Sequence, residues 1–271
     1  MIYTVNCSIL LTELPLLERP AAAKAAGFDA VEFWWPFAES VPGDADVAAF
    51  VAAIREAGVQ LTGLNFNAGD MPGGDRGLVS WPARVSEFRD NIDVVVGIGK
   101  ELGCRAFNAL YGNRLDDLSA DRHSAEEQDA VAAENLAAAA ARVAAIDGIV
   151  LLEPVSGATR YPLKTAADAV AVIDRVREQS GAGQSGVTNI KLLADFYHLS
   201  VNGDDVAAVI ETHAADFGHI QIADDPGRGA PGTGTLPLAG WLARSAELGY
   251  RGYIGLEYKA PRETAFSWLA A

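Results

Sequence analysis

The chain has 271 residues, of which 50% are hydrophobic and 21% charged, so a large core is available and a disordered chain is not expected. The formal net charge of −15 argues against nucleic acid or an anionic membrane as a partner, because phosphate binding requires clustered cations. No apolar run reaches the roughly 20 residues of a membrane span, and the N-terminus lacks the basic segment of a signal peptide, so a soluble cytoplasmic protein is expected.

An Ala-rich helix, a glycine and a short apolar strand recur along the chain. The glycines of these units are Gly27, Gly58, Gly103, Gly148 and Gly249. Glycine adopts the left-handed conformation that ends a helix, so each position predicts a passage from helix to strand. In chain order the predicted strands are Tyr3–Ser8, Ala30–Trp34, Gln60–Asn65, Arg105–Leu110, Ile149–Glu153, Lys191–Asp195, His219–Ala223 and Tyr253–Tyr258.

These strands are almost continuously apolar, which is typical of parallel strands covered on both faces. Eight strands separated by helices predict a single (β/α)8 TIM barrel over residues 1–271. The alternative is a doubly wound open sheet, which usually has a Gly-rich phosphate turn after its first strand, and Ser8–Thr12 provides none. Helices are predicted over Glu126–Ala145 and Thr165–Glu178, and a surface loop over 180–188.

Oxygen-bearing side chains lie at the ends of the last four predicted strands. They are Glu153, Asp195, Gln221 and Glu257, and a barrel would place them all at the same end. A carboxylate at the end of a buried strand is costly unless a cation or another charged group meets it. Oxygen donors without Cys suit a hard divalent ion, Mg²⁺ or Mn²⁺. The alternative is four independent surface or ion-paired side chains.

Several short segments around these strands share a further pattern. They are Val31–Pro36, Asn67–Asp70, Asp75–Gly77, Leu151–Pro154, Asp195–His198, His219–Asp224, Arg228–Gly234 and Glu257–Lys259. Together they resemble hydroxypyruvate isomerases, which belong to the xylose isomerase-like TIM barrel superfamily. The resemblance runs from about Val5 to Lys259, and the segment after the seventh strand is its most specific part.

The resemblance implies that Glu153, Asp195, Gln221 and Glu257 bind the metal, and that Glu153 and Glu257 also act as acid and base on opposite sides of the substrate. Sugar epimerases of the superfamily usually carry His in place of Gln221, which points to the hydroxypyruvate branch. One departure is Leu64, where some relatives have His, so a substrate contact by that His is not expected here.

The reaction implied is the interconversion of hydroxypyruvate and tartronate semialdehyde. A proton leaves the carbon beside a carbonyl and another is returned to the neighbouring carbon, while the metal chelates both oxygens of the enediolate. The sequence does not tell which glutamate acts first. A metal-promoted hydride shift is the alternative route.

The substrate would be a small anionic 2-oxo or hydroxy acid, whose carboxylate requires a cation. Arg228 follows the seventh strand and could make a bidentate contact. Lys259 lies two residues beyond Glu257 and shares its face if the strand continues. The resemblance implies Arg76 as a further candidate for binding this carboxylate. The alternatives are solvated side chains or, for Lys259, a salt bridge to Glu257.

Four further polar residues are assigned to the site or its surroundings. His198 is expected to hydrogen-bond a substrate oxygen, and Asn65 is included among the substrate-binding residues. His219 shares the inward face of Gln221 one layer deeper, so a supporting or core role is expected. Glu32 is either a polar group of the pocket or a structural acid. Four aromatic residues could form the pocket walls or could instead pack at the barrel end or in a subunit interface: Trp34, Trp35, Phe66 and Trp81.

Four other functions are alternatives to hydroxypyruvate isomerisation. Isomerisation of 2-oxo-tetronate uses the same chemistry, and a ketose 3-epimerase fits less well with Gln221 and the cations. A phosphodiester-cleaving relative of this barrel would need a basic, His-rich groove, whereas the chain has four His and a net charge of −15. A barrel that binds a sugar acid without turnover is the non-enzymatic alternative. The sequence leaves open whether the chain forms a homo-oligomer.

Overall fold

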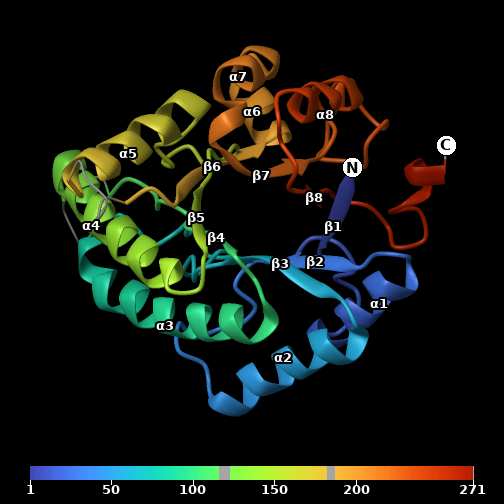
Figure 1. Cartoon of the computed structure of the whole chain (residues 1–271), viewed down its shortest axis with the longest axis horizontal. Coiled ribbons are helices and arrows are strands. Elements are labelled where there is room, and N and C mark those ends of the chain that lie inside the picture. Colours follow the sequence, from blue (N-terminus) through green and yellow to red (C-terminus); the bar gives the residue numbers. More distant parts are fainter. Residues whose placement is uncertain (116–122, 182–186, 271) are drawn as a thin grey trace.

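The computed structural model describes residues 1–115, 123–181 and 187–270. Eight parallel strands form a closed barrel in chain order, and β8 pairs with β1 (Figure 1). The predicted (β/α)8 barrel is therefore confirmed, and the closed strand order excludes the doubly wound sheet. The strands are β1 Ile2–Asn6, β2 Ala30–Phe33, β3 Gln60–Asn65, β4 Ala106–Asn108, β5 Ile149–Leu152, β6 Ile190–Asp195, β7 Phe217–Ile222 and β8 Tyr253–Leu256.

Helices surround this barrel (Figure 1). They are α1 Arg19–Ala25, α2 Asp44–Ala57, α3 Val85–Leu102, α4 Ala125–Ala144, α5 Ala166–Gln179, α6 Phe196–Asn202, α7 Val206–His213 and α8 Leu238–Glu247. Single turns of 3-10 helix occur at Leu16–Glu18, Pro82–Arg84, Ala214–Asp216 and Ser267–Ala270. Among the described helices, none combines the length and the apolar character needed to cross a bilayer.

The two predicted helices are confirmed as α4 and α5, and both begin with a capping box. The side chain of Ser124 accepts from the backbone of Glu127, and that of Thr165 accepts from the backbone of Asp168, with the reciprocal contact present in each case. These pairs satisfy donors that the first turn of a helix leaves free. Of the loop predicted over 180–188, residues 182–186 lie outside the described part of the chain.

The glycines at helix ends agree with the predicted pattern except at one position. Gly58 and Gly103 adopt the left-handed conformation at the ends of α2 and α3, with φ of 66° and 72°. After α4, however, Asp147 takes positive φ instead of Gly148. A Cβ at Gly148 would lie 3.0 Å from the Phe107 ring, so this glycine is required for close packing rather than for its φ.

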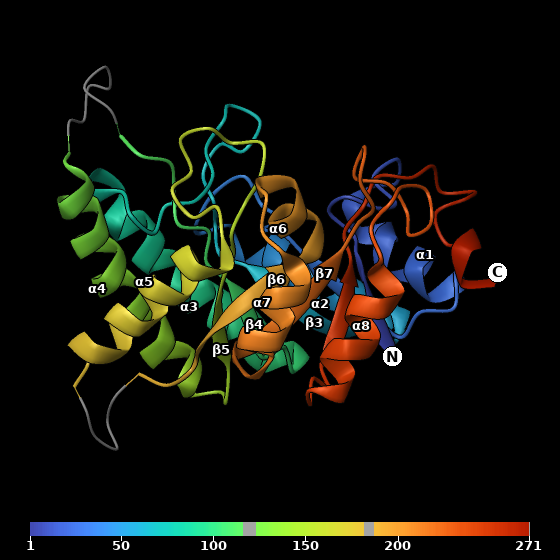
Figure 2. The same ribbon diagram turned by 90° about the horizontal axis from the view of Figure 1, so that it is seen from above.

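The loops that follow β3, β5 and β7 extend from the same side of the barrel (Figure 2). Inside the barrel, below these loops, the packing is not purely apolar. The hydroxyls of Thr4 and Thr62 are 2.7 Å apart, and Glu32 and His219 are also buried. The barrel therefore has a polar layer beneath the ends of its strands.

Candidate active site

The expected oxygen-bearing side chains lie at the C-terminal end of the barrel. Glu153 directly follows β5, Asp195 is the last residue of β6, Gln221 lies in β7 and Glu257 directly follows β8. All four are buried. Asp195 and Gln221 are partners in the register of β6 and β7, so their side chains lie next to each other on the same face.

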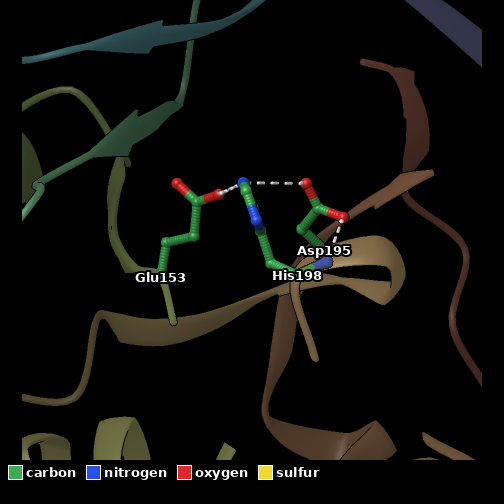
Figure 3. A group of neighbouring side chains, drawn as sticks. All are labelled: Glu153, Asp195 and His198. Carbon is green, nitrogen blue, oxygen red and sulfur yellow. Dashed lines mark hydrogen bonds and ion pairs between the residues drawn. The ribbon is translucent and has the colours of Figure 1, made fainter. Parts of the chain in front are cut away.

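Glu153, Asp195 and His198 form a close cluster (Figure 3). One ligand atom from each lies within 4.8 Å of the others, and all three residues are buried. The His198 Nε2 atom lies between the two acids, 3.9 Å from Glu153 Oε1 and 3.7 Å from Asp195 Oδ2. A buried cluster with this composition could hold a metal ion.

The two oxygens of Asp195 have different surroundings. Oδ1 caps α6, accepting the backbone N–H groups of Tyr197 at 2.8 Å and His198 at 3.2 Å. Oδ2 is buried and has no hydrogen-bond donor among the described residues. His198 Nε2 at 3.7 Å and Arg228 Nη2 at 3.6 Å lie near this oxygen without forming a hydrogen bond, so it is available to a metal cation or a ligand donor.

The ring of His198 is held in one orientation by the loop after β5. Its Nδ1 accepts the backbone N–H of Ser156 at 3.1 Å and lies 2.7 Å from the Ser156 hydroxyl. A backbone N–H can only donate, so in the neutral ring the proton is on Nε2. Burial lowers the pKa of His198 to about 4, against the opposing effect of Asp195. His198 is therefore a neutral donor directed at the acid cluster.

Gln221 contributes a second unpaired oxygen. Its Nε2 donates to Glu32 Oε1 at 2.7 Å, while its buried Oε1 has no partner among the described residues. Neighbouring strands thus present two buried oxygens that lack donors, one from Gln221 and one from Asp195. Such a pair fits a hard cation, which is the chemistry expected for this end of the barrel.

Glu257 is paired with the loop after β7. Its Oε1 accepts Arg228 Nη2 at 2.8 Å and Trp34 Nε1 at 3.1 Å. The same Arg228 atom lies 3.6 Å from Asp195 Oδ2, and its guanidinium stacks 5.5 Å above the Tyr197 ring. Arg228 therefore balances part of the negative charge at the site.

Crowding of buried acids makes their ionisation difficult. Burial, followed by the charge of Asp195, raises the pKa of Glu153 to about 8, although Asn108 opposes this by donating a hydrogen bond of 2.7 Å. Burial also raises the pKa of Glu257 well above its usual range, against the effect of Arg228. Acids with pKa values near or above neutrality suit proton transfer.

A cavity of about 410 Å³ opens above these acids. Among the predicted residues, its lining includes Asn65, Arg76, Glu153, His198, Arg228 and Glu257. A larger surface groove of about 830 Å³ lies outside the barrel between α2 and α3, away from the acid cluster. The smaller cavity is therefore the candidate substrate site.

The predicted cations Arg76 and Lys259 lie in different environments. Arg76 lines the cavity, where its Nη1 donates to the carbonyls of Met71 at 2.9 Å and Asp75 at 2.6 Å, and no carboxylate of the described residues pairs with it. Lys259 is exposed and does not line the cavity. The expected shared face fails because β8 ends at Leu256, so strand alternation does not continue to Lys259.

Asp224 is not among the predicted site residues, but it organises the loop that carries Arg228. Its buried carboxylate accepts four backbone N–H groups at 2.9–3.0 Å, from Asp225, Gly232, Gly234 and Leu236. Its backbone also exchanges two hydrogen bonds with Gly229, which close a short turn. Arg228 sits in this turn with φ of 55°. The anchored loop thus fixes Arg228 over Glu257.

We expect Asp224→Asn to lower the free energy of unfolding by about 3 kcal/mol, because the amide nitrogen would face backbone donors that now have an acceptor. Misplacing Arg228 should also reduce kcat/KM by about tenfold or more. Urea unfolding and steady-state kinetics measure the two effects. Asp225→Asn is the matched control, since no hydrogen bond links the Asp225 carboxylate to the described residues, and equal losses in both variants would contradict the anchoring role.

The sequence did not distinguish among the aromatic candidates or identify two supporting polar residues. Only Trp34 lines the cavity, whereas Phe66 packs on Phe88 and Phe107. Asn108 is the last residue of β4, but the predicted strand continued to Leu110, so the strand-end rule that found Glu153 did not select it. Ser156 lies three residues after Glu153 in an irregular loop, and no sequence pattern indicates its contact with His198.

Comparisons with known proteins agree with this architecture. A family model described as xylose isomerase-like TIM barrel matches residues 20–271. A Streptomyces coelicolor protein named "Putative hydroxypyruvate isomerase" is 53% identical, covering 99% of this chain and 95% of that protein. A Cupriavidus necator protein named 2-oxo-tetronate isomerase is 34% identical, covering 98% of this chain and 96% of that protein.

Among solved structures, the crystal structure of AP endonuclease, family 2, from Brucella melitensis superposes on the chain with a TM-score of 0.85. The two sequences are 28% identical, and the match covers 99% of this chain and 98% of that one. The likeness thus spans the whole barrel, including every strand that contributes to the acid cluster.

Proposed function

The chain belongs to the xylose isomerase-like TIM barrel family, and on that premise we propose that it interconverts hydroxypyruvate and tartronate semialdehyde with the help of a bound Mg²⁺ or Mn²⁺ ion. Its relatives are named isomerases, and the chain is an isomerase. The finer proposal concerns the substrate, the metal and the residues that act.

One observation carries the proposal: two buried oxygens on neighbouring strands accept no hydrogen bond from the described residues, and they lie at the same end of the barrel as two glutamic acids whose pKa values are raised. Asp195 Oδ2 and Gln221 Oε1 supply the unpaired oxygens. Glu153 and Glu257 supply the acids. In a polar cluster with only a structural role, these oxygens would be expected to accept hydrogen bonds from neighbouring groups. A buried oxygen that accepts none reduces stability.

In the proposed reaction, Glu153, Asp195, Gln221 and Glu257 hold the ion. When bound, the ion would withdraw charge from two adjacent substrate oxygens and so acidify the carbon-bound proton. Glu153 and Glu257 take up and return the proton at neighbouring carbons. His198 donates from Nε2 to a substrate oxygen, since Ser156 occupies its other nitrogen.

Arg76 is proposed to bind the substrate carboxylate. It is the cation of the cavity lining that is not engaged by an acid of the described residues, whereas Arg228 is already paired with Glu257. A guanidinium can bind a carboxylate through two parallel hydrogen bonds. Asn65 lines the same cavity and is proposed as a further substrate contact.

A 2-oxo-tetronate isomerase is the second candidate, favoured by the 34% identity to a protein with that name. Both substrates are anionic 2-oxo acids, so a substrate panel is needed to distinguish them. Purified protein stripped with a chelator and reloaded with Mn²⁺ or Mg²⁺ would be assayed with hydroxypyruvate, 2-oxo-tetronate and a neutral ketose. We expect turnover of hydroxypyruvate that depends on the metal, and turnover of the ketose alone would refute the proposal.

A pH dependence of stability follows from the raised pKa values of the two glutamic acids. In metal-free protein, the native state holds protons that the unfolded state has released above its carboxyl pKa of 4.5, so stability should fall as pH rises toward 8. His198, whose pKa is lowered from 6.5, opposes this slope only near the lower end of the window, because its unfolded-state ring has lost almost all of its proton by about pH 7.5. The slope should be at most about 1.4 kcal/mol per pH unit for each acid.

Urea unfolding in chelator at pH 6.5 and at pH 8 would measure this slope. Saturating Mn²⁺ should flatten or reverse it, because a cation favours the ionised carboxylates. Glu153→Gln should reduce it by removing one titrating group. A metal-free protein that became more stable across this window would contradict the assigned pKa shifts.

A further inference from the structure

Beneath the acid cluster, Glu32 accepts hydrogen bonds from three side chains of the barrel interior. Its Oε1 accepts Gln221 Nε2 at 2.7 Å and Asn6 Nδ2 at 3.2 Å. Its Oε2 lies 2.7 Å from His219 Nε2. All four residues are buried, so water does not compete for these contacts. Glu32 is thus the centre of a polar network that includes one proposed metal ligand.

The polarity of this network determines which end of the Gln221 amide faces Glu32. An ionised carboxylate can only accept, so it favours the amide nitrogen. The reversed amide would set two acceptor oxygens against each other in a buried site. With the nitrogen held by Glu32, the amide oxygen is the end that has no partner. Gln221 can therefore present its oxygen, rather than its nitrogen, as a ligand.

The neighbouring strands leave room for this arrangement. A Cβ at Gly255 would lie 2.6 Å from Glu32 Oε1 and 2.7 Å from Gln221 Cγ. A Cβ at Gly63 would lie 3.3 Å from Glu32 Cβ. The glycines of β3 and β8 thus leave the space in which the Glu32 and Gln221 side chains meet.

We propose that Glu32 is a positioning residue of the metal site, which fixes the amide of Gln221 so that its oxygen is offered to the ion. His219 and Asn6 hold Glu32 in place through their hydrogen bonds. This inference rests on the proposed metal site but goes beyond it, because Glu32 would be no ligand and would touch no substrate. Partners behind metal ligands typically affect metal affinity by about 10–100-fold.

Mn²⁺ binding measured by electron paramagnetic resonance tests the proposal without requiring turnover. We expect Glu32→Gln to weaken Mn²⁺ binding by about 10–100-fold. The decisive comparison repeats this change in a Gln221→Glu background. There the amide of Gln at position 32 can donate to the new carboxylate, so Glu32→Gln should strengthen binding. If residue 32 orients the side chain at position 221, Glu32→Gln should change the Mn²⁺ affinity in opposite directions in the two backgrounds.

Thr62→Val is the matched control. It removes two buried hydrogen bonds inside the barrel, with the Thr4 hydroxyl and the Val31 carbonyl, but Thr62 contacts neither Glu32 nor Gln221 through a hydrogen bond. It should lower the free energy of unfolding while leaving Mn²⁺ affinity within about twofold of the parent, since no hydrogen bond links Thr62 to Glu32 or to a proposed metal ligand. Unfolding measured in chelator reports stability separately for each variant.

Three results would overturn the inference while leaving the proposed metal site in place. An unchanged Mn²⁺ affinity in Glu32→Gln would show that the contact does not orient the ligand. Equal weakening in both backgrounds would assign the effect to the charge of Glu32, and equal weakening by Thr62→Val would assign it to barrel stability. Failure of the parent protein to bind Mn²⁺ would instead refute the metal site of the proposed function, and the role of Glu32 with it.

Discussion

Replacing Glu257 or Glu153 with glutamine is expected to abolish isomerisation, with a loss in kcat of about 10³-fold or more, while the fold is retained. Glutamine keeps the shape and one oxygen but can neither take up nor return a proton, and general acid–base catalysis typically contributes about 10²–10⁴-fold. Each residue is also proposed to bind the ion, which adds to the loss. Kinetics with saturating Mn²⁺, together with Mn²⁺ binding, would separate the two contributions.

Exchange of a carbon-bound substrate hydrogen with solvent would distinguish the roles of the two glutamates. If the two glutamates act at neighbouring carbons, one variant should still exchange a carbon-bound hydrogen of hydroxypyruvate with D₂O without forming product, and the other should not. Glu263→Gln, at an exposed position, is the control and should behave as the parent. Retained isomerisation in both site variants would contradict their roles. A parent protein that binds the acid but never converts it would instead favour the non-catalytic alternative.

Replacing Arg76 with glutamine is expected to reduce kcat/KM for anionic substrates by about 100-fold. The guanidinium lines the cavity without an acid partner among the described residues, so its loss removes a charged hydrogen bond to the substrate carboxylate. Such bonds contribute about 1.5–3 kcal/mol. Because that contact forms on binding, KM should carry much of the change, and steady-state kinetics would show it.

Lys259→Gln provides a control with the same change of charge. Lys259 is exposed and lies outside the cavity lining, so kcat/KM should stay within about threefold of the parent, as expected for a screened surface charge. Arg76→Lys keeps the charge but not the planar fork, and it should recover part of the loss. A larger loss in Lys259→Gln than in Arg76→Gln would reassign the carboxylate site.

The fold was predictable because each local pattern had one consistent solution. Ala-rich segments, glycines and short apolar strands alternate, and parallel strands covered on both faces leave few architectures for eight such units. Strand ends differed by up to two residues, as at Tyr3–Ser8 against Ile2–Asn6 in β1, because pairing with neighbouring strands sets where a strand stops. The sequence did not predict that Asp147, rather than Gly148, adopts positive φ after α4. This difference depends on how closely Phe107 packs against the turn.

The site was predictable where barrel geometry alone brings residues together. Side chains at the ends of consecutive parallel strands must meet at one end, which places Glu153 near Asp195. Contacts that depend on loop conformation were not predictable. The pairing of Arg228 with Glu257 requires the turn anchored by Asp224, and the outward position of Lys259 follows from the early end of β8. The catalytic and ligand roles of these residues stay predictions.

Asp195 links the start of a helix to the chemistry of the site through a single side chain. One oxygen receives the first amides of α6, and the other is left for the acid cluster. Asparagine would keep the cap but lose the charge, and glutamate would keep the charge but move it by one methylene. Neither replacement satisfies both demands, so the start of α6 and the charge of the acid cluster constrain the same side chain.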